Sequence, residues 1–178
     1  MSTSLPAPET AYLNALSAVL QQTLGPMLVG VYLFGSAAYG AYEAGLSDLD
    51  VQAVIAQAVI AQPLTEAEYR ALATAISHAA LPCPARKLEF VLYTRAAVAT
   101  PSRRPQFALN FNTGAGLPGH LGLDPAAEAS HWFVLDIALG RELGRALMGP
   151  PPAEVFAPLP REWVLSALHG FRSIPEHP

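Results

Sequence analysis

Residues 33–54 of the chain read LFGSAAYGAYEAGLSDLDVQAV. The apolar run from Leu28 ends at Phe34, and a short run of this kind closed by Gly35 predicts a buried strand. Gly35 allows the backbone to approach a ligand closely. Ser36 begins a small-residue segment that predicts a short helix, where free N–H groups and a hydroxyl suit phosphate oxygens. The alternative is an ordinary strand-to-helix turn with Ser36 as its N-cap.

Two aspartates open the next predicted strand, which covers residues 49–55. Side chains two apart on a strand share a face, so the carboxylates of Asp48 and Asp50 should project side by side. They repel each other unless a cation lies between them, and Mg²⁺ binds through one or two carboxylates plus substrate phosphates. In the alternative, Ser47 and Asp48 cap the strand and Asp50 faces solvent. However, an apolar strand follows Asp50, and a buried unpaired carboxylate is costly there.

Glu89 is a lone charge inside a third predicted strand, LEFVLY at 88–93. Neighbouring strands lie about 4.8 Å apart, so Glu89 can meet the aspartates if the two strands are adjacent and in register. A third carboxylate there would complete a metal site or take a proton from an attacking hydroxyl. The alternative is a strand-edge glutamate that faces water or pairs with Arg86 or Lys87.

The remaining patterns predict one domain with a mixed sheet flanked by helices, of the α/β or α+β class. The repeat of AVIAQ at 53–57 and 58–62 should extend or bulge the second strand beyond the site. We expect one main domain over 1–150, then a proline-rich linker and a short helical remnant over 151–178. Further elements are expected as helices over 9–24, 64–80, 125–148 and 161–171 and a strand over 106–112.

The long helix predicted over 125–148 carries an apolar stripe that should face the core. His131 and Asp136 are five residues apart on it, so they should face different sides and have structural roles. The stripe consists of Trp132, Leu135, Leu139, Leu143 and Leu147.

Composition narrows the classes of function. The 178 residues are 52% hydrophobic and 13% charged, with 10 Lys and Arg against 14 Asp and Glu. An acidic chain without a basic run is a poor candidate for nucleic-acid binding. Cys83 is the single cysteine, so no intrachain disulfide can form. Without a signal peptide or a membrane-length apolar stretch, we expect a soluble cytoplasmic protein and no membrane partner.

The combined pattern resembles a known superfamily. Gly-Ser, a spacer of about ten residues, Asp-x-Asp on a strand and a later acidic residue are similar to the DNA polymerase beta-like nucleotidyltransferases. LFGSAAYG…SDLDVQAV, KLEFVLY and LMGPPPAEVFAPLPREWVLSAL resemble the streptomycin/spectinomycin-type aminoglycoside adenylyltransferases, over about residues 10–170. The resemblance implies that Asp48 and Asp50 bind Mg²⁺ and that Glu89 is the catalytic base. It also implies triphosphate contacts from Gly35, Ser36 and Ser47.

The resemblance implies transfer of a nucleoside monophosphate, AMP from ATP, to a hydroxyl of a small acceptor such as an aminoglycoside, and hence antibiotic resistance. Two alternatives remain: AMPylation of a protein in a toxin–antitoxin-like pair, and a non-catalytic nucleotide-binding or oligomerisation module. The antibiotic-modifying relatives have a further C-terminal helical domain, where this chain offers only residues 161–172. That short helix is expected to pack on the domain or on a second copy in a homodimer, unless the sequence is truncated.

Overall fold

The computed structural model describes residues 5–56, 63–104 and 106–172. Its centre is a six-stranded sheet in the order β5-β4-β3-β2-β1-β6. β2 and β3 run parallel, and every other neighbouring pair is antiparallel. The expected mixed sheet is therefore confirmed. The strands are β1 Leu28–Phe34, β2 Leu49–Ile55, β3 Leu88–Thr94, β4 Phe107–Thr113, β5 His120–Gly122 and β6 Arg145–Met148.

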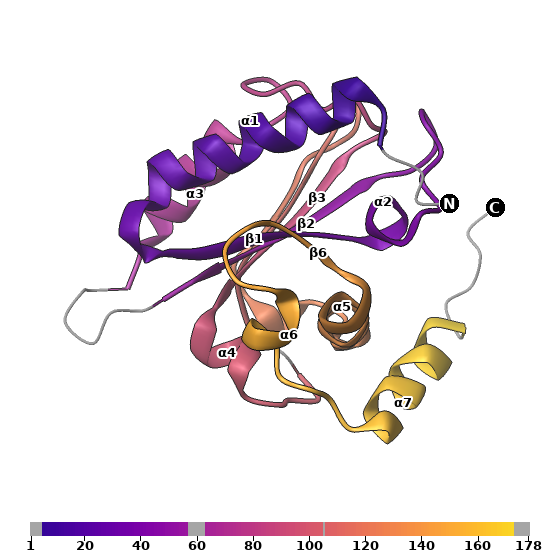
Figure 1. Ribbon diagram of the computed structural model, residues 1–178. Helices are drawn as coiled ribbons and strands as arrows, with labels where there is room; N and C mark the ends of the chain where they lie inside the picture. The colour runs from indigo at the N-terminus through magenta and orange to yellow at the C-terminus, as the bar shows by residue number, and fades with distance from the viewer. Residues whose placement is uncertain (1–4, 57–62, 105, 173–178) are drawn as a thin grey trace.

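Helices cover both faces of the sheet (Figure 1). α1 (Ala7–Leu24) and α3 (Glu66–Ala75) lie on one face. α5 (Ser130–Leu143) lies on the other, together with the short α4 (Arg95–Ala99) and α6 (Pro152–Val155). The remaining elements are α2 (Gly35–Tyr39), α7 (Arg161–Arg172) and the 3₁₀ turns η1 (Gly25–Met27) and η2 (Pro125–Ala127).

Strand alternation gives the sheet one apolar core on each face, because successive side chains point to opposite sides. Along β2, Val51 and Ala53 belong to the core under α1 and α3, whereas Val54 belongs to the core under α5. The helix expected over 9–24 is confirmed as α1, and its Leu16 and Leu20 are fully buried against the sheet. Each buried leucine contributes about 1.5–3 kcal/mol.

The start of α3 is fixed by a capping box. The Thr65 hydroxyl accepts a hydrogen bond from the Glu68 backbone N–H at 3.3 Å, and the Glu68 carboxylate accepts from the Thr65 N–H at 2.7 Å. Such a cap contributes about 1 kcal/mol to helix stability. The helix ends at Ala75, so the predicted end at Ala80 was wrong; residues 77–81 form turns instead.

A bulge in β4 decides which of its side chains reach the α5 face. The pairing of β4 with β3 skips Ala108. An extra residue shifts the alternation of a strand by one position. Phe107 therefore packs in the core under α5, and Asn110 and Asn112 point to the same face. Leu109 packs on the opposite side, with α1 and α3.

The prediction of one helix from 125 to 148 was wrong. α5 ends at Leu143, and the Gly144 N–H donates to the carbonyl of Gly140 at 2.9 Å. The next four residues form β6, which pairs with the edge of β1. The helical spacing of leucines continued past Gly144 by coincidence, because hydrogen bonds to β1 set the conformation there.

The apolar stripe predicted for the long helix also differs from the buried face of α5. Trp132, Leu139 and Leu143 are 44%, 40% and 54% exposed, whereas Leu135 is buried. The reason is that α5 lies between the sheet and α7 and is therefore buried on two sides. Its buried residues are Phe133, Val134, Leu135, Ile137 and Gly140.

The C-terminal helix packs back on the domain. Ala167 of α7 is buried against Val134 and Leu135 of α5. The Arg103 guanidinium lies 5.3 Å from the centre of the Trp163 ring, a cation–π contact that joins α7 to the loop after α4.

The domain division at residue 150 and the homodimer both stay predictions. The second AVIAQ copy lies outside the described residues.

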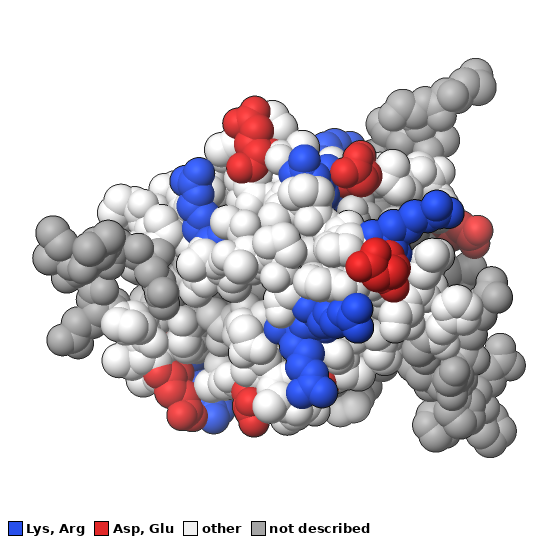
Figure 2. Space-filling view, turned by 90° about the horizontal axis from the view of Figure 1, so that it is seen from below, with Lys and Arg blue, Asp and Glu red and all other residues white. Residues whose placement is uncertain are grey.

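Charge is dispersed over the face that lies lowest in Figure 1. Figure 2 shows this face from below, with Lys, Arg, Asp and Glu scattered among uncharged side chains. The view gives no support to a nucleic-acid surface there, which would need clustered cations. Within the segments that the structure describes, no helix combines the length and the apolar character needed to cross a bilayer.

Gly140 should be required for the close packing of α5 on β1. A Cβ at Gly140 would lie 2.2 Å from the Phe34 ring. Gly140→Ala should therefore lower the free energy of unfolding by about 1–3 kcal/mol, as overpacking does, although alanine is the better helix former. Urea denaturation measures this change. Adding Phe34→Leu should recover part of the loss, and Leu139→Ala on the exposed side should cost little. A neutral or stabilising Gly140→Ala would contradict the packing.

Candidate functional site

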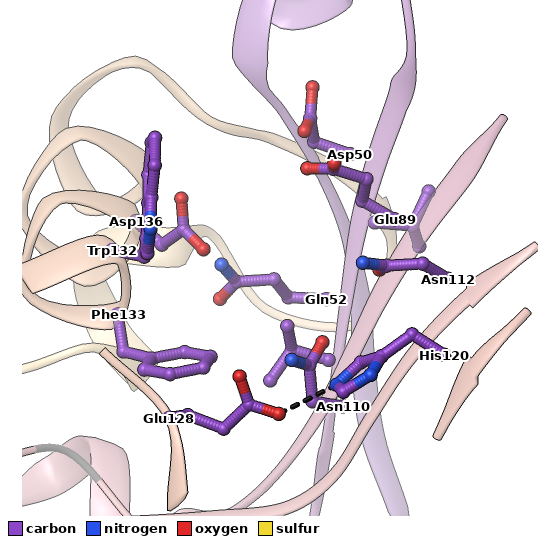
Figure 3. Close-up of a pocket in the computed structure, with 12 residues that line it drawn as sticks. Asp50, Gln52, Glu89, Asn110, Asn112, His120, Glu128, Trp132, Phe133 and Asp136 are labelled. Carbon is purple, nitrogen blue, oxygen red and sulfur yellow. Dashed lines mark hydrogen bonds and ion pairs between the residues drawn. The ribbon is translucent and has the colours of Figure 1, made fainter. Parts of the chain in front are cut away.

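A pocket of about 380 Å³ lies between the sheet and α5. Four strands and the start of α5 contribute to its walls (Figure 3). Most of the lining side chains are polar, and among these described residues four are carboxylic acids and none is Lys or Arg. The polar lining consists of Asp50, Gln52, Glu89, Asn110, Asn112, His120, Glu128 and Asp136.

Asp50 and Glu89 are direct neighbours on the two parallel strands at the centre of the sheet. This is the register that the sequence argument required, and both side chains line the pocket. Burial, followed by the negative charge and the hydrogen bond of Glu89, raises the pKa of Asp50 well above its ordinary value. Two carboxyl groups this close favour a shared proton or a bound cation. Asp50 therefore does not behave as a solvent-facing aspartate.

Gly35 leaves the space that the Asp50 carboxylate occupies. β1 pairs Phe34 with Asp50, so the following residue lies beside the carboxylate. A Cβ built on Gly35 would fall 1.9 Å from Asp50 Oδ2, and the φ of Gly35 is +60°. A side chain at this position would displace the carboxylate and strain the backbone. The glycine expected to approach a ligand is thus in contact with the acidic pair.

Asp48 precedes β2 and does not line the pocket. Its carboxylate accepts two hydrogen bonds from the Arg86 guanidinium, at 2.8 and 2.7 Å. Lys87 Nζ lies 3.6 Å from Asp48 Oδ2 and forms an ion pair with Glu89. The pairing of Glu89 with Lys87, an alternative from the sequence, is present. Lys87 connects Asp48 to the Asp50–Glu89 pair.

The two serines lie near the acidic residues but outside the pocket lining. Ser36 is in α2, and its carbonyl accepts a hydrogen bond from the Ala41 N–H at 3.0 Å. The Ser47 hydroxyl accepts from the Glu43 N–H at 3.0 Å and closes the turn before β2. Triphosphate contacts from Gly35, Ser36 and Ser47 stay predictions.

Asp136 is a pocket residue that the sequence argument missed by assigning it a structural role. α5 carries it over β2, where it faces Gln52 across the pocket (Figure 3). Burial, followed by the negative charges of Asp50 and Glu89, raises the pKa of Asp136 to about 8. The available signal was a lone charge inside an apolar helix, the same signal that identified Asp50 in its strand. As expected, His131 lines a different pocket.

The other end of the pocket has an ion pair and an aromatic wall. His120 Nε2 lies 2.6 Å from Glu128 Oε1, which joins β5 to the loop before α5 (Figure 3). Trp132 and Phe133 form the wall on the helix side. No strand was expected at His120, because the three-residue β5 forms only by pairing with β4.

The donors near Asp50 suit a hard divalent cation. Mg²⁺ prefers carboxylate oxygens, and the adjacent carboxyl groups of Asp50 and Glu89 repel each other when both are ionised. Over residues 5–56, 63–104 and 106–172, no three Asp, Glu, His or Cys side chains already form a complete metal-binding group. Asp48 is instead turned to Arg86 and Lys87. The residues therefore fit the cation if Asp48 changes partners.

The fold resembles solved structures of nucleotidyltransferases. The spectinomycin adenyltransferase AAD(9) from Enterococcus faecialis, in a structure with ATP and spectinomycin, matches with a TM-score of 0.67 and 17% identity. The match covers 90% of this chain and 64% of that chain. At this identity the likeness concerns the fold, so the expected nucleotidyltransferase fold is confirmed. This chain spans less than two thirds of the AAD(9) chain.

Two weaker similarities are to toxin–antitoxin structures. One is a toxin–antitoxin with AMP-PNP, with 16% identity, a TM-score of 0.40 and coverage of 90% of this chain and 86% of that chain. The other is the tri-AMPylated Shewanella oneidensis HEPN toxin with the MNT antitoxin, with 14% identity, a TM-score of 0.38 and coverage of 92% and 87%. No protein-family model and no curated protein sequence matches the chain.

The buried Asp136 should make the protein less stable as pH rises. The pKa of its carboxyl is 3.8 ordinarily and about 8 in the folded protein, so between these values the folded protein keeps a proton that the unfolded chain has lost. The free energy of unfolding should then fall with pH by up to about 1.4 kcal/mol per unit from this group. Urea denaturation from pH 5 to pH 8 measures the slope.

Asp136→Asn removes the ionisation and keeps a polar side chain of nearly the same size and shape beside Gln52. We expect this variant to be less sensitive to pH than the wild-type protein. Glu142→Gln, on the same helix and 71% exposed, serves as the control and should keep the wild-type slope. Equal slopes in Asp136→Asn and in the wild-type protein would show that Asp136 is not buried as an acid.

Proposed function

We propose that the protein is a Mg²⁺-dependent nucleotidyltransferase that moves a nucleoside monophosphate, AMP from ATP, to a hydroxyl of a small acceptor. The observation that carries the proposal is the side-by-side position of Asp50 and Glu89, with Gly35 against the Asp50 carboxylate. Two carboxyl groups held this way are unfavourable without a cation or a proton. Replacing one of the two carboxyl groups by a neutral side chain would make the fold more stable, so stability alone does not explain the pair.

Glu89 is suited to act as the general base. Its side chain is 38% exposed, so an acceptor in the pocket can reach it while Asp50 stays behind it. Glu89 takes the proton of the acceptor hydroxyl, whose oxygen attacks the α-phosphorus. The bond from that phosphorus to the bridging oxygen breaks, and pyrophosphate leaves. Gly35, Ser36 and Ser47 hold the triphosphate in this proposal.

Asp48 and Asp50 would hold the divalent cation. When bound, it offsets the negative charge that develops on the phosphate oxygens in the transition state. Asp50 already faces the pocket, and Lys87, which contacts both Asp48 and Glu89, connects Asp48 to the same region. For this the Asp48 carboxylate exchanges its present partners.

The acceptor side of the pocket favours a hydroxylated, amine-bearing molecule such as an aminoglycoside. Glu128 adds a carboxylate beyond the acidic pair, and the amides of Asn110 and Asn112 and the carboxyl group of Asp136 can hydrogen-bond hydroxyls. Trp132 offers a flat apolar surface for a sugar or cyclitol ring. This character supports a cationic acceptor over an anionic one.

The direct test is incubation with Mg²⁺, each nucleoside triphosphate and a panel of aminoglycosides, followed by mass spectrometry. AMP attached to a small acceptor is the expected result, with Glu89→Gln losing at least about a hundredfold in rate, as removal of a general base does. Nucleotide attached only to protein would favour AMPylation of a partner. Absence of pyrophosphate release under all conditions would favour the non-catalytic module.

Asp50→Asn should abolish nucleotide binding without lowering the stability of the fold. We expect it to abolish Mg²⁺-dependent triphosphate binding, measured by calorimetry, because it removes a metal ligand. Its melting temperature should be equal to or higher than that of the wild-type protein, since the repulsion from Glu89 is relieved. Glu66→Gln on exposed α3 is the control and should change neither. Unchanged nucleotide affinity in Asp50→Asn would remove the basis of the proposed site.

A further inference from the structure

The two cations beside the acidic site are placed to compete with a metal ion. Arg86 holds Asp48 with two parallel hydrogen bonds, and Lys87 reaches both Asp48 and Glu89. Building on the proposed function, we propose that Arg86 and Lys87 are exchangeable counter-ions. In the free protein they neutralise Asp48 and Glu89, and a divalent cation displaces them so that they can engage the phosphates of the nucleotide.

The backbone of both residues is fixed beside Asp48, so an exchange involves side chains only. The Arg86 N–H donates to the Ser47 carbonyl at 3.3 Å, and the Leu49 N–H donates to the Lys87 carbonyl at 3.0 Å. These bonds keep the segment before β3 aligned with the segment before β2. The charged ends of Arg86 and Lys87 can therefore leave the carboxylates without disturbing the sheet.

The ion pairs are exposed enough to exchange. The Arg86 side chain is 54% exposed and the Lys87 side chain 23%, against 16% for Asp48. Solvent-exposed ion pairs contribute little to stability, so breaking them costs little. By contrast, a divalent cation brings twice the charge to the same oxygens. The relative exposure also indicates which partner moves, because Asp48 is the more enclosed group.

An open space next to the acidic pocket can receive the freed cations. A second pocket of about 240 Å³ is lined by Arg86, Lys87, Thr113 and Leu117, among others, and shares Asn112 and His120 with the first. None of the described residues that line it is acidic. Cations released from Asp48 and Glu89 would face no carboxylate there, and phosphate oxygens are the matching ligand for a guanidinium.

The experiment compares Mn²⁺ binding in the wild-type protein and three variants, without nucleotide, by the electron paramagnetic resonance of free Mn²⁺. Arg86→Lys keeps the positive charge but loses the two parallel hydrogen bonds to Asp48. It therefore distinguishes competition by the guanidinium for the Asp48 oxygens from an effect of its charge alone. We expect Arg86→Lys to bind Mn²⁺ about two- to fivefold more tightly than wild type, and Arg86→Gln more tightly still. Arg70→Gln, in the exposed pair with Glu66, is the control and should match wild type.

A second measurement, of nucleotide affinity, should change in the opposite direction. Binding of a non-hydrolysable ATP analogue at saturating Mg²⁺ should weaken about two- to tenfold in Arg86→Gln, because a phosphate contact is lost. A stability defect alone cannot tighten metal binding and weaken nucleotide binding together, and melting temperatures check that the variants are folded.

Three results would overturn the exchange. Equal Mn²⁺ affinity in Arg86→Lys and wild type would show that Arg86 does not occupy a metal position. Unchanged analogue affinity in Arg86→Gln would show that the released guanidinium does not reach the phosphates. In both cases wild type still binds metal and nucleotide, so the proposed function survives. Absence of Mn²⁺ binding in every protein, Arg86→Gln included, would instead remove the metal site and the exchange together.

Discussion

The site depends on one constraint: the carboxyl group of Asp50 is held inside the protein beside that of Glu89. Sheet register fixes their separation, because the two residues are paired on adjacent parallel strands. Gly35 leaves the space that the Asp50 carboxylate occupies. The Asp50 carboxyl is the more enclosed of the two, whereas the Glu89 side chain is 38% exposed. The protein therefore has to supply positive charge or a proton at this point. The cations near the pair meet this requirement.

The sequence predicted those parts of the site that local periodicity determines. Asp50 and Glu89 each interrupt a short apolar run, and a charge in such a run either faces a functional pocket or is costly. The same reasoning was not applied to Asp136, because a helix has a solvent side on which an aspartate costs nothing. Which side of α5 faces the sheet depends on α7 and on Gly140, which are contacts between distant segments. Spacing within one helix does not contain that information.

The β4 bulge and β6 show the same limit for the fold. Residues 145–148 continue a helical spacing of leucines, yet they form a strand because the edge of β1 offers hydrogen-bond partners. The bulge at Ala108 brings Asn110 and Asn112 into the pocket, where the alternation of the sequence alone would put Leu109. Two of the eight polar residues that line the pocket thus come from a strand whose alternation shifts at a single extra residue, which only the pairing with β3 reveals.

Charge balance gives a physical reason for the arrangement of the site. Asp48, Asp50 and Glu89 carry three acidic groups, and Arg86 and Lys87 supply two positive charges. The raised pKa of Asp50 means that a proton can supply the third, which leaves the free site close to neutral. A divalent cation adds two positive charges at the carboxylates, as many as Arg86 and Lys87 supply there. The side chains released in this way would then carry their positive charge to an incoming polyphosphate, so that metal and nucleotide each favour the binding of the other.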